Sequence, residues 1–180
     1  MNITIHEGRP TEPRSKREES AYNLLDKLGV KYKRADHEEA ATMEACLEVD
    51  RALGVVMCKN LFLTNRQRTA FYLLLMPGDK PFKTKELSGQ LGVARLSFGS
   101  GEDMEELLGL TPGSVSVLGL MNDLDHDVTL LIDEDLYSAE MFGCHPLVNT
   151  SSLAFSTTEL FDKIIPALGH TPTKVRLIGE

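Results

Sequence analysis

The chain has 180 residues and carries 19 Lys and Arg against 27 Asp and Glu, which gives a net charge of −8. This acidity argues against a protein that coats nucleic acid, because neutralising many phosphates needs a clear basic excess. A hydrophobic content of 42% and a charged content of 26% are typical of a globular domain and exclude disorder over most of the chain. A chain of this length can bury one core, so we expect a single domain.

The three cysteines, Cys46, Cys58 and Cys144, lie far apart and form no C-x-x-C pair. An odd number with this spacing predicts neither a disulfide framework nor a zinc knuckle, so we expect a reduced, cytoplasmic protein. The first 20 residues have no apolar stretch behind their charges, and no later apolar run approaches the ~18 residues that span a bilayer. The sequence therefore predicts no signal peptide and no membrane contact.

Capping signals and apolar periodicity predict the first elements. The spacing Ser15-x-x-Glu18 is a capping box, and it predicts a helix that ends at Gly29. Apolar and basic residues alternate over residues 30–35, as in a half-buried strand, and the pattern over residues 42–53 predicts a second helix. The unit formed so far is helix, strand, helix.

Two apolar runs, residues 55–64 and 69–76, flank a polar turn and predict a buried antiparallel hairpin. The later elements are expected in this order: a helix over 84–91, a strand over 95–98, a helix over 100–108, strands over 115–121 and 128–132 that face each other across a polar turn, a strand over 152–155, a helix over 156–168 and a strand over 174–178. Strands joined partly by short turns and partly through helices predict a mixed α/β fold. No glycine-rich nucleotide-binding motif is present.

An acidic segment imitates a calcium-binding loop. Asp123, Asp125, Asp127 and Glu134 have the spacing of an EF-hand, but Val128 occupies the sixth position, where the turn needs Gly. An acidic turn before a strand is therefore the favoured interpretation. The five histidines show no H-x-x-x-H or H-E-x-x-H spacing, so neither a metal nor another cofactor is expected.

Cys144 and His145 are neighbours and raise the possibility of a cysteine hydrolase. A nucleophile and its base must meet through space, whereas neighbours in an extended segment point to opposite sides. We therefore interpret Cys144 as a small apolar side chain near the core and expect no cysteine chemistry.

Lys59 and Asn60 interrupt an otherwise apolar strand. A buried Lys costs several kcal/mol unless it meets an anion or a polar cavity, so this interruption marks a candidate site. An edge strand whose Lys59 side chain reaches water is the alternative, and the residues alone leave both readings open.

The charge is segregated along the chain. Residues 59–95 hold seven basic and two acidic residues, whereas residues 96–180 hold three basic and fourteen acidic ones. The basic residues of this segment are Lys59, Arg66, Arg68, Lys80, Lys83, Lys85 and Arg95. A solvated face is the simplest reading, but the pattern also permits a local phosphate-binding patch around the candidate site.

Several short blocks together resemble the YbaK and prolyl-tRNA-synthetase-associated editing-domain family. They are H-E-E-A-A-T (37–42), K-N-L-F-L (59–63), K-E-L (85–87), R-L-S-F (95–98), L-T-P-G-S-V (110–115) and H-P-L-V-N-T (145–150). The resemblance implies one domain over residues 15–180, with a curved, largely antiparallel mixed sheet flanked by helices. Residues 1–14 would be an N-terminal extension, a candidate flexible segment because it is polar and contains Pro10 and Pro13.

The resemblance also implies a reaction, the hydrolysis of mischarged Ala-tRNA(Pro). A pocket sized for proline rejects a smaller apolar amino acid by only about 1 to 3 kcal/mol per missing methylene, so a second sieve is needed. An aminoacyl ester is already activated, so a positioned water and an oxyanion donor suffice without a metal or a nucleophilic side chain. Cys-tRNA(Pro) or another small aminoacyl-tRNA is the alternative substrate, and a non-catalytic module that binds aminoacyl-tRNA or a small ligand is the alternative class.

Matched position by position, the family implies three catalytic residues. Lys59 would hold the acceptor-end phosphate or the ester carbonyl, the backbone at Gly143 would receive the oxyanion, and His145 would orient the amine, ester or water. The implied substrate and tRNA contacts are Asn60, Lys85, Arg95, Pro146 and Asn149. The implied partner is the acceptor end of tRNA(Pro), with transient contact to prolyl-tRNA synthetase as an option and neither DNA nor a membrane. So short a chain is expected to act in trans.

Overall fold

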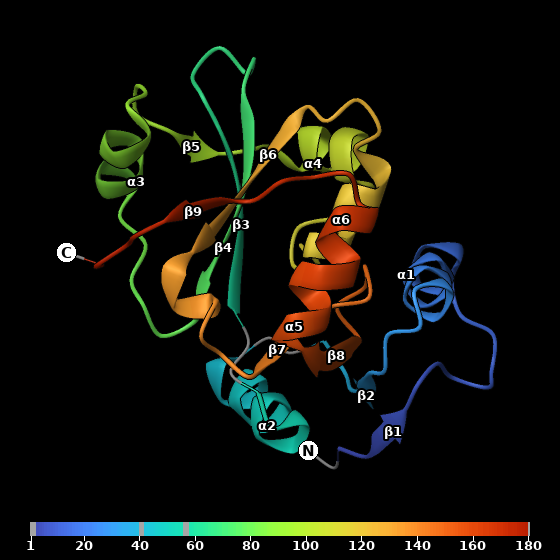
Figure 1. Cartoon of the computed structure of the whole chain (residues 1–180). Helices are drawn as coiled ribbons and strands as arrows, with labels where there is room; N and C mark the ends of the chain where they lie inside the picture. Colours follow the sequence, from blue (N-terminus) through green and yellow to red (C-terminus); the bar gives the residue numbers. More distant parts are fainter. Residues whose placement is uncertain (1–2, 40–41, 56–57, 180) are drawn as a thin grey trace.

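The computed structural model describes residues 3–39, 42–55 and 58–179, and their strands form two sheets (Figure 1). The four-stranded sheet has the order β1 (Ile5–Glu7), β2 (Lys33–Asp36), β8 (Ser151–Ser156) and β7 (Met141–Cys144). The five-stranded sheet has the order β5 (Ser97–Phe98), β3 (Cys58–Thr64), β4 (Phe71–Pro77), β6 (Val128–Asp133) and β9 (Thr173–Val175).

The pairings confirm the predicted mixed α/β class. All pairs in the four-stranded sheet are antiparallel, as are β3–β4 and β3–β5, whereas β4–β6 and β6–β9 are parallel. The division of the strands between two sheets is not visible in the apolar pattern, because alternation reports a buried face but not the neighbouring strand.

The predicted hairpin forms between β3 and β4, in register from Cys58 opposite Pro77 to Thr64 opposite Phe71. The side chain of Asn65 fixes the turn, because its Oδ1 accepts the N–H groups of Thr69 and Ala70 at 2.8 and 3.2 Å. Residues 56 and 57 of the predicted first strand lie outside the described residues.

Four of the predicted helices are present, and three of them begin with a side-chain cap. The four helices are α1 (Lys16–Lys27), α2 (Met43–Leu53), α3 (Thr84–Leu91) and α4 (Gly101–Leu108). Ser15 Oγ accepts the N–H of Glu18, Thr42 Oγ1 accepts that of Ala45, and α2 ends at Gly54 with a φ of 73°. Among the described residues, no helix has the length and apolar character needed to cross a bilayer.

The predicted helix over 156–168 is a composite of α5 (Thr157–Glu159), the π-helical η3 (Leu160–Ile164) and α6 (Ile165–Ala167). Pro166, the second residue after the wide turn, has no N–H group to donate to that turn. The helix therefore changes its hydrogen-bond spacing where its sequence removes a donor.

The predicted strand over residues 115–121 is wrong. Residues Val117–Asn122 instead form a 3₁₀ helix, η1, whose first turn is capped because Ser116 Oγ accepts the N–H of Leu118 at 3.2 Å. Val117, Leu118 and Leu120 are all buried, so the run has no polar side whose spacing would distinguish a helix from a strand. The strand predicted over 128–132 exists as β6, but it pairs in parallel with β4 and not with residues 115–121.

The main core packs α1, the composite C-terminal helix and both sheets together. Leu73 and Leu75 of β4 belong to this cluster, whereas Leu74 and Met76 point to the opposite face and join a smaller cluster with Leu87 of α3. Both faces of β4 are therefore buried, which explains why its sequence is a continuous apolar run. In Figure 1, α1, α2 and α3 lie at the periphery around the crossing strands.

A network of charges joins the start of α1 to the four-stranded sheet. The carboxylate of Asp36, at the end of β2, accepts bonds from Arg14, Arg34 and the hydroxyl of Ser151, the last at 2.6 Å. Burial disfavours the charged carboxylate, but the bonds from Arg14 and Arg34 outweigh it and hold the pKa of Asp36 well below its usual range.

This network predicts a pH-dependent contribution to stability. Asp36→Asn removes a charge-assisted acceptor and is expected to lower the free energy of unfolding by roughly 2 kcal/mol at pH 7. Because the pKa of Asp36 is depressed in the folded state, its contribution is complete above the unfolded value of about 3.9 and declines as the pH falls below it. Urea denaturation of both proteins at pH 7 and pH 3 measures the difference.

Lys163→Ala is the matched control, since it breaks an exposed pair with Glu159 at 3.5 Å and should change stability by less than about 0.5 kcal/mol. Equal effects of the two substitutions at pH 7, or an Asp36→Asn effect that does not shrink on acidification, would contradict the assignment.

Candidate active site

A cavity of about 510 Å³ collects four of the residues singled out in the sequence, Lys59, Asn60, His145 and Asn149. Its walls come from α2, the start of β3, the segment after β2, the loop after β7 and the start of β8. This volume is within the range of small-molecule sites. Gly113, from the predicted L-T-P-G-S-V block, also lines the cavity, with a φ of 93° that favours glycine.

Lys59 has features of both interpretations that the sequence left open, a residue at a polar cavity and a residue on an edge strand. Among the described residues, β5 pairs with Leu63 and Thr64 of β3, so the Lys59 end of β3 has no described strand partner on that side. Lys59 is nevertheless half-buried as a residue and lines the cavity, and its ammonium donates to the carbonyl of Lys80 at 2.6 Å. One donor bond leaves further N–H groups of the ammonium available to an anion or carbonyl in the cavity.

His145 is held as one tautomer. Its Nδ1 lies 2.9 Å from the carbonyl oxygen of Ser151, and because a carbonyl only accepts, Nδ1 carries the proton of that bond. Burial lowers the pKa of His145, so the ring is neutral near pH 7 and its Nε2 has a free lone pair. Such an imidazole can accept a hydrogen bond from water or from a substrate amine.

His37 and Ser152 also line the cavity, and neither was selected from the sequence as a site residue. His37 Nε2 lies 2.9 Å from Ser152 Oγ, and the rings of His37 and His145 have centroids 6.4 Å apart. His37 belongs to a block that carries the family resemblance, but its partner is 115 residues away, so no local spacing could have identified the pair.

The charged side chains of the lining are mostly acidic. Among the described lining residues, Glu39, Asp50 and Asp79 contribute carboxylates and Lys59 contributes an ammonium. Aliphatic surface is added by Leu47 and Val49. A small cationic and partly apolar group, such as the ammonium and side chain of an amino acid, matches this environment in charge and polarity.

Gly143 and Pro146 are buried beside the cavity but do not line it. Gly143 lies within β7 opposite Ala154, and its carbonyl faces Cys58 Sγ at 4.0 Å. Cys144 is also buried in β7, and burial raises the pKa of its thiol above the usual range and that of Cys58 to about 12. Neither thiol is therefore a ready nucleophile near pH 7.

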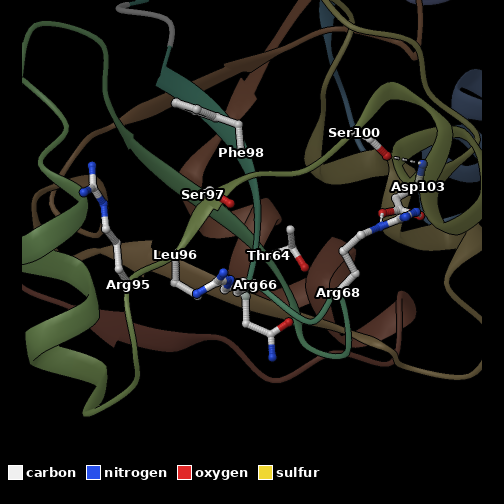
Figure 2. Close-up of a pocket in the computed structure, with 10 residues that line it drawn as sticks. Thr64, Arg66, Arg68, Arg95, Leu96, Ser97, Phe98, Ser100 and Asp103 are labelled. Carbon is white, nitrogen blue, oxygen red and sulfur yellow. Dashed lines mark hydrogen bonds and ion pairs between the residues drawn. The ribbon is translucent and has the colours of Figure 1, made fainter.

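A second depression of about 580 Å³ holds the arginines of the basic segment, and we call it the arginine groove (Figure 2). Arg66, Arg68 and Arg95 line it, and Figure 2 shows Arg68 turned toward Asp103 with Arg95 at the opposite end. Arg68 makes two bonds to the Asp103 carboxylate, at 2.8 and 2.6 Å. Arg66 and Arg95 make no ion pair with any residue of the described part of the chain.

The arginine groove is separate from the cavity. Thr64 lines the groove and Lys59 lines the cavity, and the five residue steps between them along β3 span about 17 Å. Lys85 is exposed on α3 and lines neither. Lys80 is instead bound to Asp133 and Asp135, each at 2.8 Å. The fold therefore brings together only some of the basic residues of segment 59–95.

The acidic segment forms a structural turn before β6. Asp123 is buried, and its two oxygens accept the N–H groups of Asp127 and Val128, each at 2.9 Å. His170 Nε2 contacts the same carboxylate at 2.9 Å. The Asp side chain thus serves the turn and a buried histidine, in agreement with the favoured sequence interpretation.

Comparison with known proteins establishes the family. A family model described as "Aminoacyl-tRNA editing domain" matches residues 37–163, which include every lining residue of both depressions. The chain therefore belongs to the aminoacyl-tRNA editing-domain family, whose members are hydrolases that deacylate aminoacyl-tRNA.

Individual relatives and a solved structure resemble this chain over most of its length. The chain is 30% identical over 153 residues to the prolyl-tRNA editing protein ProX of Acetoanaerobium sticklandii, covering 85% of this chain and 93% of ProX. It is 28% identical over 151 residues to prolyl-tRNA synthetase associated domain-containing protein 1 of Danio rerio, covering 83% and 81% of the two chains. A solved structure of a proposed trans-editing enzyme for prolyl tRNA synthetase shares the fold, with a TM-score of 0.67, 17% identity and coverage of 92% and 100%.

The burial of the thiols predicts unequal reactivity toward a maleimide or disulfide reagent. Cys46 is exposed on α2, whereas Cys58 and Cys144 are buried with raised pKa values. One thiol per chain should therefore react rapidly in the native protein at pH 7.5, and three after denaturation. Peptide mapping should place the rapid label on Cys46, and rapid labelling of Cys144 would contradict the structure.

Proposed function

We propose that this protein hydrolyses mischarged Ala-tRNA(Pro) in trans. The observation that carries the proposal is the cavity, which sets the half-buried residue Lys59 and a neutral histidine against a largely apolar wall with three carboxylates among its described residues. An aminoacyl ester presents the complementary groups, namely a cationic amine, a small side chain and a carbonyl beside phosphates. Similarity to ProX supports prolyl-tRNA as the tRNA concerned.

The proposed reaction is attack of water on the ester carbonyl. Lys59 donates a hydrogen bond to the ester carbonyl or to the terminal phosphate, and His145 Nε2 accepts one from the attacking water or the substrate amine. In this proposal the backbone at Gly143 receives the developing oxyanion and Pro146 contacts the substrate, although both are buried and do not line the cavity as it stands, while Asn60 and Asn149 supply amide groups to the substrate. The ester bond to the terminal ribose breaks, and free alanine and the ribose hydroxyl leave.

In this proposal, the cavity distinguishes aminoacyl-tRNAs by the size of the amino acid side chain. The synthetase pocket distinguishes alanine from proline by only about 1 to 3 kcal/mol per missing methylene, because a smaller side chain always fits. A cavity that receives the smaller side chain and excludes the proline ring removes the error without damage to the correct product. Leu47 and Val49 are the aliphatic lining residues that would limit its size.

The arginine groove extends the proposed contact to the RNA backbone. Arg66 and Arg95 have no carboxylate partner in the described part of the chain, and Thr64, which lines the same groove, lies about 17 Å along β3 from Lys59. If the 3′ end of a tRNA enters the cavity, the paired stem that precedes this end can reach the arginine groove. Phosphate contacts there position the ester without reading its sequence.

Hydrolysis of separately charged tRNAs tests the function. Ala-tRNA(Pro) should lose its ester faster than Pro-tRNA(Pro), with Cys- and Ser-tRNA(Pro) as the comparison of small side chains. Lys59→Ala should lower the rate roughly 100-fold or more, as expected for loss of one oxyanion or phosphate donor, while Lys163→Ala should not. Failure of the wild type to hydrolyse any of these esters faster than buffer would refute the proposal, and full activity of Lys59→Ala would misplace its site.

The arginine groove predicts a change in salt dependence. Arg66→Ala and Arg95→Ala should each raise KM with little change in kcat and reduce the slope of log affinity against log salt by about 0.7 to 0.9 per lost phosphate contact. Arg176→Ala is the control, since Arg176 is 78% exposed and paired with Glu134 outside the groove. Slopes that stay equal in all three variants would exclude the groove from tRNA binding.

A further inference from the structure

A continuous chain of hydrogen bonds runs behind the cavity from His145 to His37. Ser152 Oγ lies 2.9 Å from His37 Nε2 and 3.5 Å from His145 Nδ1, so a single hydroxyl contacts both rings. His37 Nδ1 lies 2.8 Å from the carbonyl oxygen of Glu38, and His145 Nδ1 lies 2.9 Å from that of Ser151. Each imidazole is therefore anchored at Nδ1 by a backbone carbonyl.

The direction of every bond in this chain follows from the two carbonyls. Because a carbonyl only accepts, both Nδ1 atoms carry protons, and the Nε2 of a neutral His37 must be the acceptor of its pair. The Ser152 hydroxyl then donates to His37 Nε2 and turns its lone pairs toward the N–H of His145. This arrangement leaves His145 Nε2 as the unprotonated nitrogen at the cavity.

Ser152 and His37 also have the spacing of a nucleophile and its base, and burial decides against that role. Ser152 is 1% exposed and its oxygen is engaged by both histidine rings, so it is not presented as a free nucleophile to an incoming ester. A hydroxyl in this position restrains the His145 ring.

We propose that His37 and Ser152 are positioning residues that hold the His145 ring in the orientation that presents its Nε2 to the cavity. The Ser151 carbonyl fixes which nitrogen of His145 carries the proton. The Ser152 hydroxyl is a second contact of the same ring edge, and it is itself held by its bond to His37 Nε2.

Several other charged or titratable groups lie near His37. Asp36 precedes it on β2 and is bound to Arg14 and Arg34, while Glu38 and Glu39 follow it. The other titratable groups that share its cavity are Cys46 and Asp50 of α2, Cys58 and Lys59 of β3, Asp79 after β4, and His145 after β7. Among the described residues, Ser152 is the one whose side chain contacts both His37 and His145 by a hydrogen bond.

The kcat of Ala-tRNA(Pro) deacylation tests this inference, which rests on the proposed function. His37→Leu removes the acceptor of the Ser152 hydroxyl and should lower kcat about ten-fold with little change in KM. His37→Gln can still accept from that hydroxyl and should retain most of the wild-type rate.

Substitution at Ser152 separates positioning from simple packing. Ser152→Ala should lower kcat about ten-fold or more with little change in KM, because His145 loses its link to His37. Ser152→Thr keeps the hydroxyl and should restore most of the rate. His126→Gln is the control, since His126 is exposed and packs against His170, and it should leave kcat unchanged.

The outcomes are distinguishable. If the wild-type protein hydrolyses no ester, the proposed function is wrong. If the wild type is active and His37→Leu keeps the wild-type kcat, or His37→Gln loses as much activity as His37→Leu, the inference about His37 is overturned while the function stands. An unchanged kcat for Ser152→Ala would overturn it as well.

Discussion

The antiparallel pairing of β2 with β8 is the constraint on which the site depends. Asp36 lies opposite Ser151 and accepts its hydroxyl at 2.6 Å, and the next residue, His37, donates its backbone N–H to Thr150 at 2.9 Å. The Asp36 carboxylate is in turn bound by two arginines. A slip of one residue would turn each side chain to the other face of the sheet, so this register alone sets His37 against Ser152.

The positions of the charged side chains in this molecule are more informative than its net charge. The net charge of −8 describes a surface that repels nucleic acid in general, while three carboxylates line the cavity and three arginines line the groove. One of those arginines is already neutralised by Asp103. An acidic cavity for an amine beside a small basic groove for phosphates suits a partner that is held briefly by one end.

Features with a local cause were predictable from the sequence, and features with a distant cause were not. Helix starts at Ser15 and Thr42 follow from side chains that bond within three residues, and the hairpin follows from the Asn65 turn. The 3₁₀ helix at Val117–Asn122 was missed because burial on all sides leaves no period to detect. Lys59 stood out as a charge in an apolar strand, whereas the contact between His37 and Ser152 spans 115 residues and exists only in the fold.

The central claim is that the cavity between Lys59 and His145 receives the aminoacyl end of a tRNA. A crystal structure with the amide-linked analogue of alanyl-adenosine, which water cannot readily hydrolyse, tests it directly. The account predicts the alanyl group inside the cavity, its carbonyl within hydrogen-bond distance of Lys59 Nζ and its amine near His145 Nε2 or a lining carboxylate. An alanyl group bound elsewhere, or a prolyl analogue seated equally deeply, would contradict it.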